Sequence, residues 1–137
     1  MKTLAIDLAA LGDVEPLWRD WLEDARRRLR VNVDALEEEL PNWGRLLERF
    51  AEERAPVYFR RDPDVSNALR RLESAGTQIV VFTDAPPELA RVALAHLGAT
   101  RRVGGLEAGS GARARTLERL GREAVVVSTR EELLAVT

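Results

Sequence analysis

The chain has 137 residues and a formal net charge of −2, from 21 basic and 23 acidic side chains. This length suits one domain with a buried hydrophobic core. The slightly negative net charge argues against binding to nucleic acid or to an anionic membrane surface. Because the sequence has no cysteine, disulfides, thiolate catalysis and cysteine-bound metals are excluded. No apolar run approaches the roughly 20 residues of a membrane helix, and the N-terminus lacks a signal-peptide layout, so we expect a cytoplasmic protein.

A buried strand is predicted over residues 3–6, with a single acid, Asp7, at its tip. The run is too short for a helix, and it is apolar on both faces, as are the strands of parallel sheets. The next four residues, 8–11, offer no charge, hydroxyl or glycine. Asp7 is therefore either a functional acid or a structural one that accepts hydrogen bonds from the N–H groups of residues 9–12.

Residues 14–54 are predicted to be all-helical. Apolar residues recur at helical spacing over 14–29 and define one face of a helix. Asp34 is expected to cap a short second helix that stops before Pro41, and Asn42 is expected to cap a third helix.

After Pro56, apolar strands alternate with helices. Helices are expected from Asp62-Pro63, from Pro86-Pro87, over 111–121 and over 130–136, and buried strands over 78–82 and 123–128, with a brief edge strand within 100–105. Strands that alternate with helices form parallel sheets with right-handed crossovers. The predicted fold class is therefore α/β: a small Rossmannoid parallel sheet with an all-helical segment inserted after strand one.

Polar residues stand at the ends of the predicted strands: Asp7 after the first, Thr83 after the second and Ser128-Thr129 after the third. In an open parallel sheet, ligands bind beyond the carboxyl ends of the strands. An acid and a hydroxyl on adjacent strand ends would form a phosphate pocket, in which Thr83 would offer its hydroxyl and the next helix N-terminus its free N–H groups. The alternative is that these side chains only cap turns and helices.

Two stretches carry a resemblance to a known family. LAIDLAALGDVEPLW resembles the first signature of the haloacid dehalogenase-like (HAD-like) hydrolase superfamily, and VVFTDAPPELARVALAHLG resembles the second. The resemblance implies a HAD-like core over residues 1–13 and 55–137 and a reduced helical cap over 14–54. It also implies that Asp7 stands at the position of the nucleophile and metal ligand, and that Thr83 stands at a catalytic position that binds phosphate. The matched frame of the two signatures predicts that strand one is central and that Asp7 and Thr83 lie side by side at one end of the sheet.

The other catalytic groups of the signatures are absent. The family's second Asp, the general acid–base, maps to Ala9, and Lys2, the only lysine, lies before the first strand. Glu107 or Arg113 falls nearest to the lysine of the third signature, and Arg113 is a further candidate for binding phosphate. The metal-binding acid of the fourth signature maps to Thr129.

The missing groups decide the predicted function. Glu131 and Glu132 follow the fourth position closely but are expected to begin the last helix, so whether they, Glu107 or Arg113 replace a missing group stays open. A general acid–base contributes about 10²–10⁴-fold, and magnesium needs several oxygen ligands. We therefore predict a HAD-like protein that is catalytically impaired or inactive and binds a small phosphorylated ligand or a protein partner. The alternative is a magnesium-dependent phosphohydrolase with Asp7 as nucleophile; without activity, no cofactor is expected to bind tightly.

All three tryptophans, Trp18, Trp21 and Trp43, lie in the predicted cap. Bulky residues are needed where a thin helical layer covers a sheet, and tryptophan is also enriched at interfaces. The second interpretation would allow a homodimer that forms through the cap.

Overall fold

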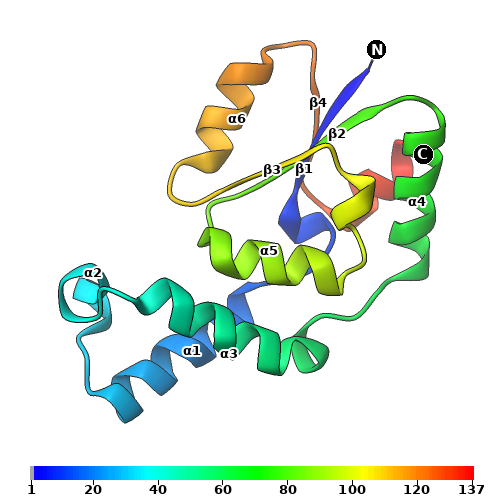
Figure 1. Cartoon of the computed structure of the whole chain (residues 1–137). Coiled ribbons are helices and arrows are strands. Elements are labelled where there is room, and N and C mark those ends of the chain that lie inside the picture. The colour runs from blue at the N-terminus through cyan, green and yellow to red at the C-terminus, as the bar shows by residue number, and fades with distance from the viewer. Residues whose placement is uncertain (1) are drawn as a thin grey trace.

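The computed structural model describes residues 2–137, and over this range the chain is α/β around one four-stranded sheet (Figure 1). All strand pairs are parallel, in the order β3-β2-β1-β4. The strands are β1 (Thr3–Asp7), β2 (Gln78–Thr83), β3 (Gly105–Ala108) and β4 (Val125–Val127). The α-helices are α1 (Glu15–Asp24), α2 (Leu36–Glu39), α3 (Trp43–Tyr58), α4 (Pro63–Ser74), α5 (Pro87–His96), α6 (Ala112–Leu120) and α7 (Arg130–Ala135). The predicted α/β class with a small parallel sheet is confirmed.

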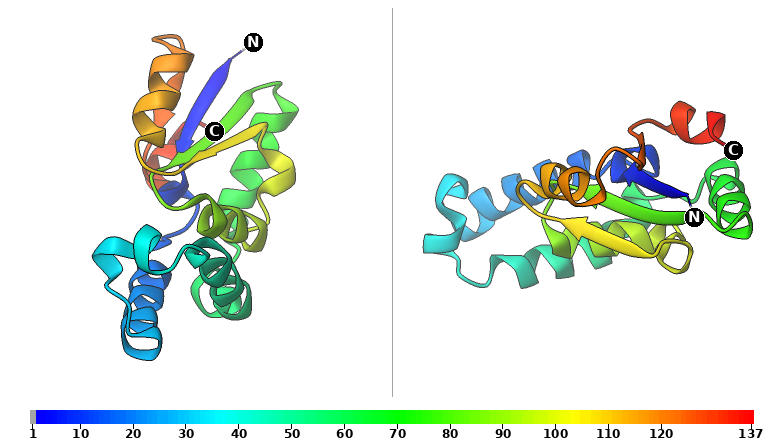
Figure 2. Two further views of the ribbon diagram at one scale, coloured as in Figure 1. Left: turned by 60° about the vertical axis from the view of Figure 1, so that its left-hand side comes forward. Right: turned by 90° about the horizontal axis from the view of Figure 1, so that it is seen from above.

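The sheet lies between two layers of helices. From β1 through β2 to β3 the sheet grows in one direction, so right-handed crossovers place α4 and α5 on the same face. The return from β3 to β4, on the far side of β1, places α6 on the opposite face (Figure 2). Because helices cover both faces, residues 4–6 of β1 and 79–82 of β2 are all buried.

Helices α1, α2 and α3 form a layer at the end of the molecule toward which β1 runs, and α3 lies along α5 (Figure 1). Leu17 and Trp21 of α1 and Leu47 of α3 belong to the same buried cluster as the apolar face of α5. The helical layer and the sheet therefore share one core. Within residues 2–137, none of the helices has both the length and the apolar character needed to cross a membrane.

The helical layer differs from its prediction in three places, one of which is that Asn42 precedes α3 but its side chain accepts no capping hydrogen bond. The helical segment extends further than predicted: α3 continues to Tyr58, so the helix runs across the predicted boundary at residues 54 and 55. Pro56 lies in the last turn of α3, and its fixed φ is compatible with a helix. Asp34 does not cap α2; instead the Asn32 side chain accepts a hydrogen bond from the Asp34 N–H at 3.0 Å, which starts a 3-10 turn, η3 (Val33–Ala35).

Both edge strands also differ from their predictions. The edge strand expected within residues 100–105 begins only at Gly105, because residues 100–102 form a 3-10 turn, η4 (Thr100–Arg102). The strand predicted to be buried over 123–128 forms the opposite edge of the sheet, and its Val125 and Val126 are each 37% exposed. An apolar run alone does not distinguish a central strand from an edge strand, because both require only apolar, β-forming residues.

Candidate functional site

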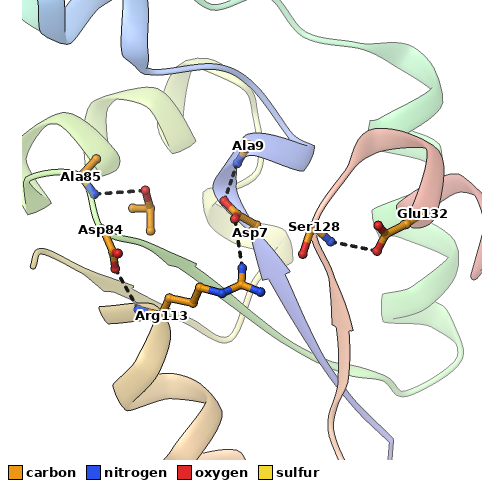
Figure 3. A network of polar contacts seen from close by, with 8 residues as sticks. Asp7, Ala9, Asp84, Ala85, Arg113, Ser128 and Glu132 are labelled. Carbon is orange, nitrogen blue, oxygen red and sulfur yellow. Dashed lines mark hydrogen bonds and ion pairs between the residues drawn. The ribbon is translucent and has the colours of Figure 1, made fainter. Parts of the chain in front are cut away.

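Asp7 and Thr83 end the two central strands of the sheet. In the parallel register of β1 and β2, Asp7 stands opposite Phe82, so Thr83 lies one residue further at the same end. The predicted adjacency of these two strand ends is confirmed. Asp7 Oδ1 accepts a hydrogen bond from the Ala9 N–H at 3.0 Å, and Thr83 Oγ1 accepts one from the Ala85 N–H at 3.2 Å (Figure 3). Each side chain therefore caps the turn that leaves its strand.

Arg113, in the first turn of α6, extends to Asp7. Its Nη1 lies 3.5 Å from Asp7 Oδ2 (Figure 3), and its Cζ lies 5.2 Å from the centre of the Phe82 ring. Both charged side chains are partly exposed, so the ion pair contributes at most about 1 kcal/mol to stability. The ring of Phe82 adds a favourable surface for the guanidinium. One oxygen of Asp7 thus has a backbone donor, and the other has a cation beside it.

Asp84 fixes the position of Arg113. The N-cap residue of α6 is Gly111, which has no side chain, and Asp84 Oδ1 accepts a hydrogen bond from the Arg113 N–H at 3.0 Å (Figure 3). The Gly109 N–H also donates to the Ala85 carbonyl at 2.8 Å. The loop after β2 therefore caps α6 and holds the start of that helix near the end of β1.

Glu107, the other candidate for the lysine position, is bound to α6. Its Oε2 accepts a hydrogen bond from the buried Thr116 hydroxyl at 2.6 Å, and Arg119 pairs with its Oε1. The hydrogen bond from Thr116 is the main cause that lowers the pKa of the Glu107 carboxyl, and Arg119 lowers it further. Of the two candidates, Arg113 is therefore the one that contacts Asp7.

The acids after β4 belong to the start of α7, as expected from the sequence. Thr129 Oγ1 accepts a hydrogen bond from the Glu132 N–H at 3.1 Å. The Glu132 carboxylate accepts one from the Ser128 N–H at 3.2 Å, which Figure 3 shows. This reciprocal arrangement is a form of capping box. Glu131 is exposed in the first turn of α7.

Of the two metal-binding positions that the resemblance implies, only that of Asp7 holds an acid, because Thr129 stands at the other. In the part of the chain that the structure describes, no three His, Cys, Asp or Glu side chains come together in a group that could hold a metal ion. The weak affinity for magnesium expected from the sequence stays a prediction.

A cleft of about 890 Å³ opens beside this end of the sheet. One side consists of the loops after β2 and β3, and the other side consists of residues from α1, η3, α2 and α3. Thr83 and Asp84 line the cleft, whereas Asp7 and Arg113 do not. Sequence reasoning missed this cleft, because its walls come from segments far apart in the chain; the only local signals were the tryptophans and the acidic run 37–39.

Comparisons with known proteins do not assign a family. No family model matches the chain, and a search of curated proteins found no match. The resemblance to the HAD-like superfamily therefore stays a prediction from the sequence motifs quoted above.

Proposed function

We propose that the chain is a HAD-like protein that does not catalyse phosphoryl transfer and acts by binding. The observation that carries this proposal is the environment of Asp7: one carboxylate oxygen accepts the Ala9 N–H, and the other lies beside the Arg113 guanidinium. A nucleophile must direct an electron-rich oxygen at phosphorus, whereas the hydrogen bond to one oxygen and the cation beside the other lower the nucleophilicity of this carboxylate. Asp7 then acts as the cap of the 3-10 turn η1 (Leu8–Ala10) and as the counter-ion of Arg113.

The residue next to this carboxylate supports the same proposal. Ala9, at the position where the family has its general acid–base, has no proton to give, and such a group typically contributes about 10²–10⁴-fold to a rate. A magnesium ion would need several oxygen ligands and would compete with Arg113 for Asp7. Both the attack on phosphorus and the departure of the leaving group are therefore expected to be slow.

The adjacent cleft provides a place for a ligand. Its volume of about 890 Å³ falls within the range of small-molecule sites, about 300–1,000 Å³. It lies at the carboxyl end of β2, which is where ligands bind in open parallel sheets. Size and place thus support the binding of a small molecule.

A magnesium-dependent phosphohydrolase is the second candidate, and one observation favours it. Arg113 lies 3.5 Å from Asp7, so a cation is present to offset charge when a phosphate approaches. In this interpretation Asp7 would be the nucleophile, and an acid from outside the present contacts would have to complete the metal site.

Hydrolysis of p-nitrophenyl phosphate with magnesium distinguishes the two candidates. The leaving group of this substrate barely needs a general acid, so the missing acid at Ala9 has little effect on the rate. The assay therefore tests the attack by Asp7 on phosphorus. We expect the wild type, Asp7→Asn and Asp13→Asn all to give background rates. Asp13 is a matched control, because it accepts one hydrogen bond from the N–H two residues later at 3.0 Å, as Asp7 does.

The phosphohydrolase hypothesis predicts a different outcome of the same assay. A wild-type rate above about 1 s⁻¹, the low end for ordinary enzymes, that Asp7→Asn abolishes and Asp13→Asn retains would establish the phosphohydrolase. Arg113→Ala would then be expected to lower the rate as well, because the compensating cation would be gone.

A further inference from the structure

The ionisable residues that line the cleft all have the same sign of charge. Five acids face it, and within the part of the chain that the structure describes no arginine, lysine or histidine does: Glu15, Asp34, Glu37, Glu38 and Asp84. The whole chain has nearly equal numbers of basic and acidic residues, 21 and 23, so the lining differs from the average surface. Carboxylates that surround a concave site concentrate the negative potential inside it. The cleft therefore favours a cationic ligand over a phosphorylated one.

The cleft also has aromatic walls. Trp18 of α1 and Trp43 of α3 line it, each half-buried, with their ring centres 6.2 Å apart in an edge-to-face arrangement. Trp21 packs against both rings from the buried side. Two indole rings that are fixed by such packing offer hydrophobic surface and a negative π face to an organic cation.

A third observation comes from the end of β2. The Thr83 side chain lines the cleft and is only 9% exposed. Its oxygen accepts the Ala85 N–H, but within residues 2–137 its hydroxyl proton has no acceptor, although a buried hydroxyl normally donates a hydrogen bond. The hydroxyl can therefore donate a hydrogen bond to a polar group of a ligand in the cleft.

We propose that this cleft binds an aliphatic polyamine, in which ammonium groups are separated by methylene chains. Four of the carboxylates belong to the helical side of the cleft and Asp84 belongs to the opposite side, and tryptophans and prolines line the same cleft. A ligand that combines separated charges with apolar segments matches this lining. The indole rings would contact the methylene chain and the ammonium groups, and the carboxylates would pair with the ammonium groups. The proposal rests on the binding role proposed above and specifies its ligand class.

Titration with spermidine, followed by tryptophan fluorescence and by calorimetry, tests the proposal. Because Trp18 and Trp43 line the cleft, we expect a saturable fluorescence change with one site per chain. The double variant Glu37→Gln/Glu38→Gln should weaken binding by about tenfold or more. Glu39→Gln is the matched control, because Glu39 belongs to the same helix α2 but does not line the cleft, and it should stay within about twofold of the wild type.

Further titrations identify the basis of recognition. The diamine putrescine should bind more weakly than spermidine, since it has fewer charges, and magnesium chloride at equal ionic strength should not reproduce the fluorescence change. A second variant, Trp18→Leu, should weaken spermidine binding while circular dichroism shows an unchanged fold. These results would support a site that recognises both the charge and the methylene chain of the ligand.

Three results would overturn the proposal: no saturable spermidine binding, an equal loss in Glu39→Gln and in the double variant, or tighter binding of inorganic phosphate than of spermidine. The failure of this proposal differs from the failure of the proposed function. If spermidine does not bind and the phosphatase rate is at background, only the proposed ligand class is rejected. If hydrolysis depends on Asp7, the proposed non-catalytic role is rejected.

Discussion

The carboxylate of Asp62 serves two helices. Its Oδ1 accepts hydrogen bonds from the N–H groups of Asp64 and Val65 at the start of α4, and its Oδ2 pairs with Arg130 Nε, at the start of α7, at 2.6 Å. The hydrogen bond from Arg130 is the main cause that lowers the pKa of the Asp62 carboxyl, and the two backbone donors lower it further. One side chain thus caps α4 and joins α4 to α7.

Two substitutions separate these roles of Asp62. Asp62→Asn removes the charge but keeps a capping oxygen, and asparagine caps helices about as well as aspartate. Because the ion pair is partly exposed, we expect Asp62→Asn to lower the free energy of unfolding by less than about 1 kcal/mol. Asp62→Ala should lower it by about 1 kcal/mol more, because the cap is lost as well. Urea unfolding at neutral pH measures both values, and equal stability of the two variants would contradict the capping role.

The ion pair also has a pH dependence with a defined sign. Because folding lowers the pKa of Asp62 from its ordinary value of 3.8, the charged carboxylate stabilises the native state at pH values above 3.8. This contribution is lost as the pH falls through the lower folded-state pKa. The difference in stability between the wild type and Asp62→Asn should therefore be complete at neutral pH and shrink below about pH 4. A difference that stays constant down to about pH 2 would show that the charge of Asp62 is not its source.

The end of α4 depends on a glycine in a left-handed conformation. Gly76 has φ +80, and the Thr77 N–H donates to the Leu72 carbonyl at 3.0 Å, so the chain turns from the helix into β2. No atom lies within 4 Å of the place where a Cβ at Gly76 would stand. A substitution there therefore tests backbone conformation alone.

We expect Gly76→Ala to lower the free energy of unfolding by about 1 kcal/mol, because a Cβ disfavours positive φ. Gly105→Ala is the matched control: a Cβ at Gly105 also meets no atom within 4 Å, and its φ is not in the left-handed region. The control should stay within about 0.5 kcal/mol of the wild type. Thermal and urea unfolding measure both variants, and a Gly76→Ala protein as stable as the wild type would show that the turn can be rebuilt without glycine.

Elements with local signals could be predicted from the sequence, and elements without them could not. Helix α4 begins at Pro63, where an aspartate followed by proline predicts it, because both residues act on the first turn itself. The strand β3 (Gly105–Ala108) is short and begins with glycine, so no apolar period indicates it. Beyond Pro56, the Tyr58 hydroxyl donates a hydrogen bond to Asp20 of α1, and Phe59 lies in the shared core. A local rule about proline does not include such tertiary contacts.

The candidate site likewise has one feature that the sequence predicts and one that it does not. The adjacency of Asp7 and Thr83 could be predicted from the resemblance of the two stretches to the family signatures, because apolar strands alone do not give the order of strands in a sheet. The pairing of Asp7 with Arg113 joins residues that are 106 positions apart, and the sequence left Glu107 and Arg113 as alternatives. Arg113 is held near Asp7 because Asp84, in the loop after β2, accepts a hydrogen bond from the Arg113 N–H. No local pattern in the sequence indicates this contact between two loops.

The helical layer and the sheet are joined by a shared core rather than by a boundary. The resemblance implies a cap over residues 14–54, yet Leu17, Trp21 and Leu47 from this segment lie in one buried cluster with Leu89 of α5. Leu17, Leu47 and Leu89 are each fully buried. Apolar surface that is buried between two segments makes the folding of each depend on the other.

We therefore expect the helical layer and the sheet to unfold in one cooperative transition. The three tryptophans lie between residues 18 and 43, so their fluorescence reports on the helical layer, whereas far-ultraviolet circular dichroism reports on every helix. In urea the two signals should share one midpoint, as in two-state unfolding of a small domain. Leu47→Ala, which removes a fully buried side chain of α3, should lower the free energy of unfolding by about 2–5 kcal/mol and move both midpoints equally. A fluorescence midpoint at lower urea than the dichroism midpoint, in the wild type or in Leu47→Ala, would show instead that the helical layer unfolds alone, as a separate cap would.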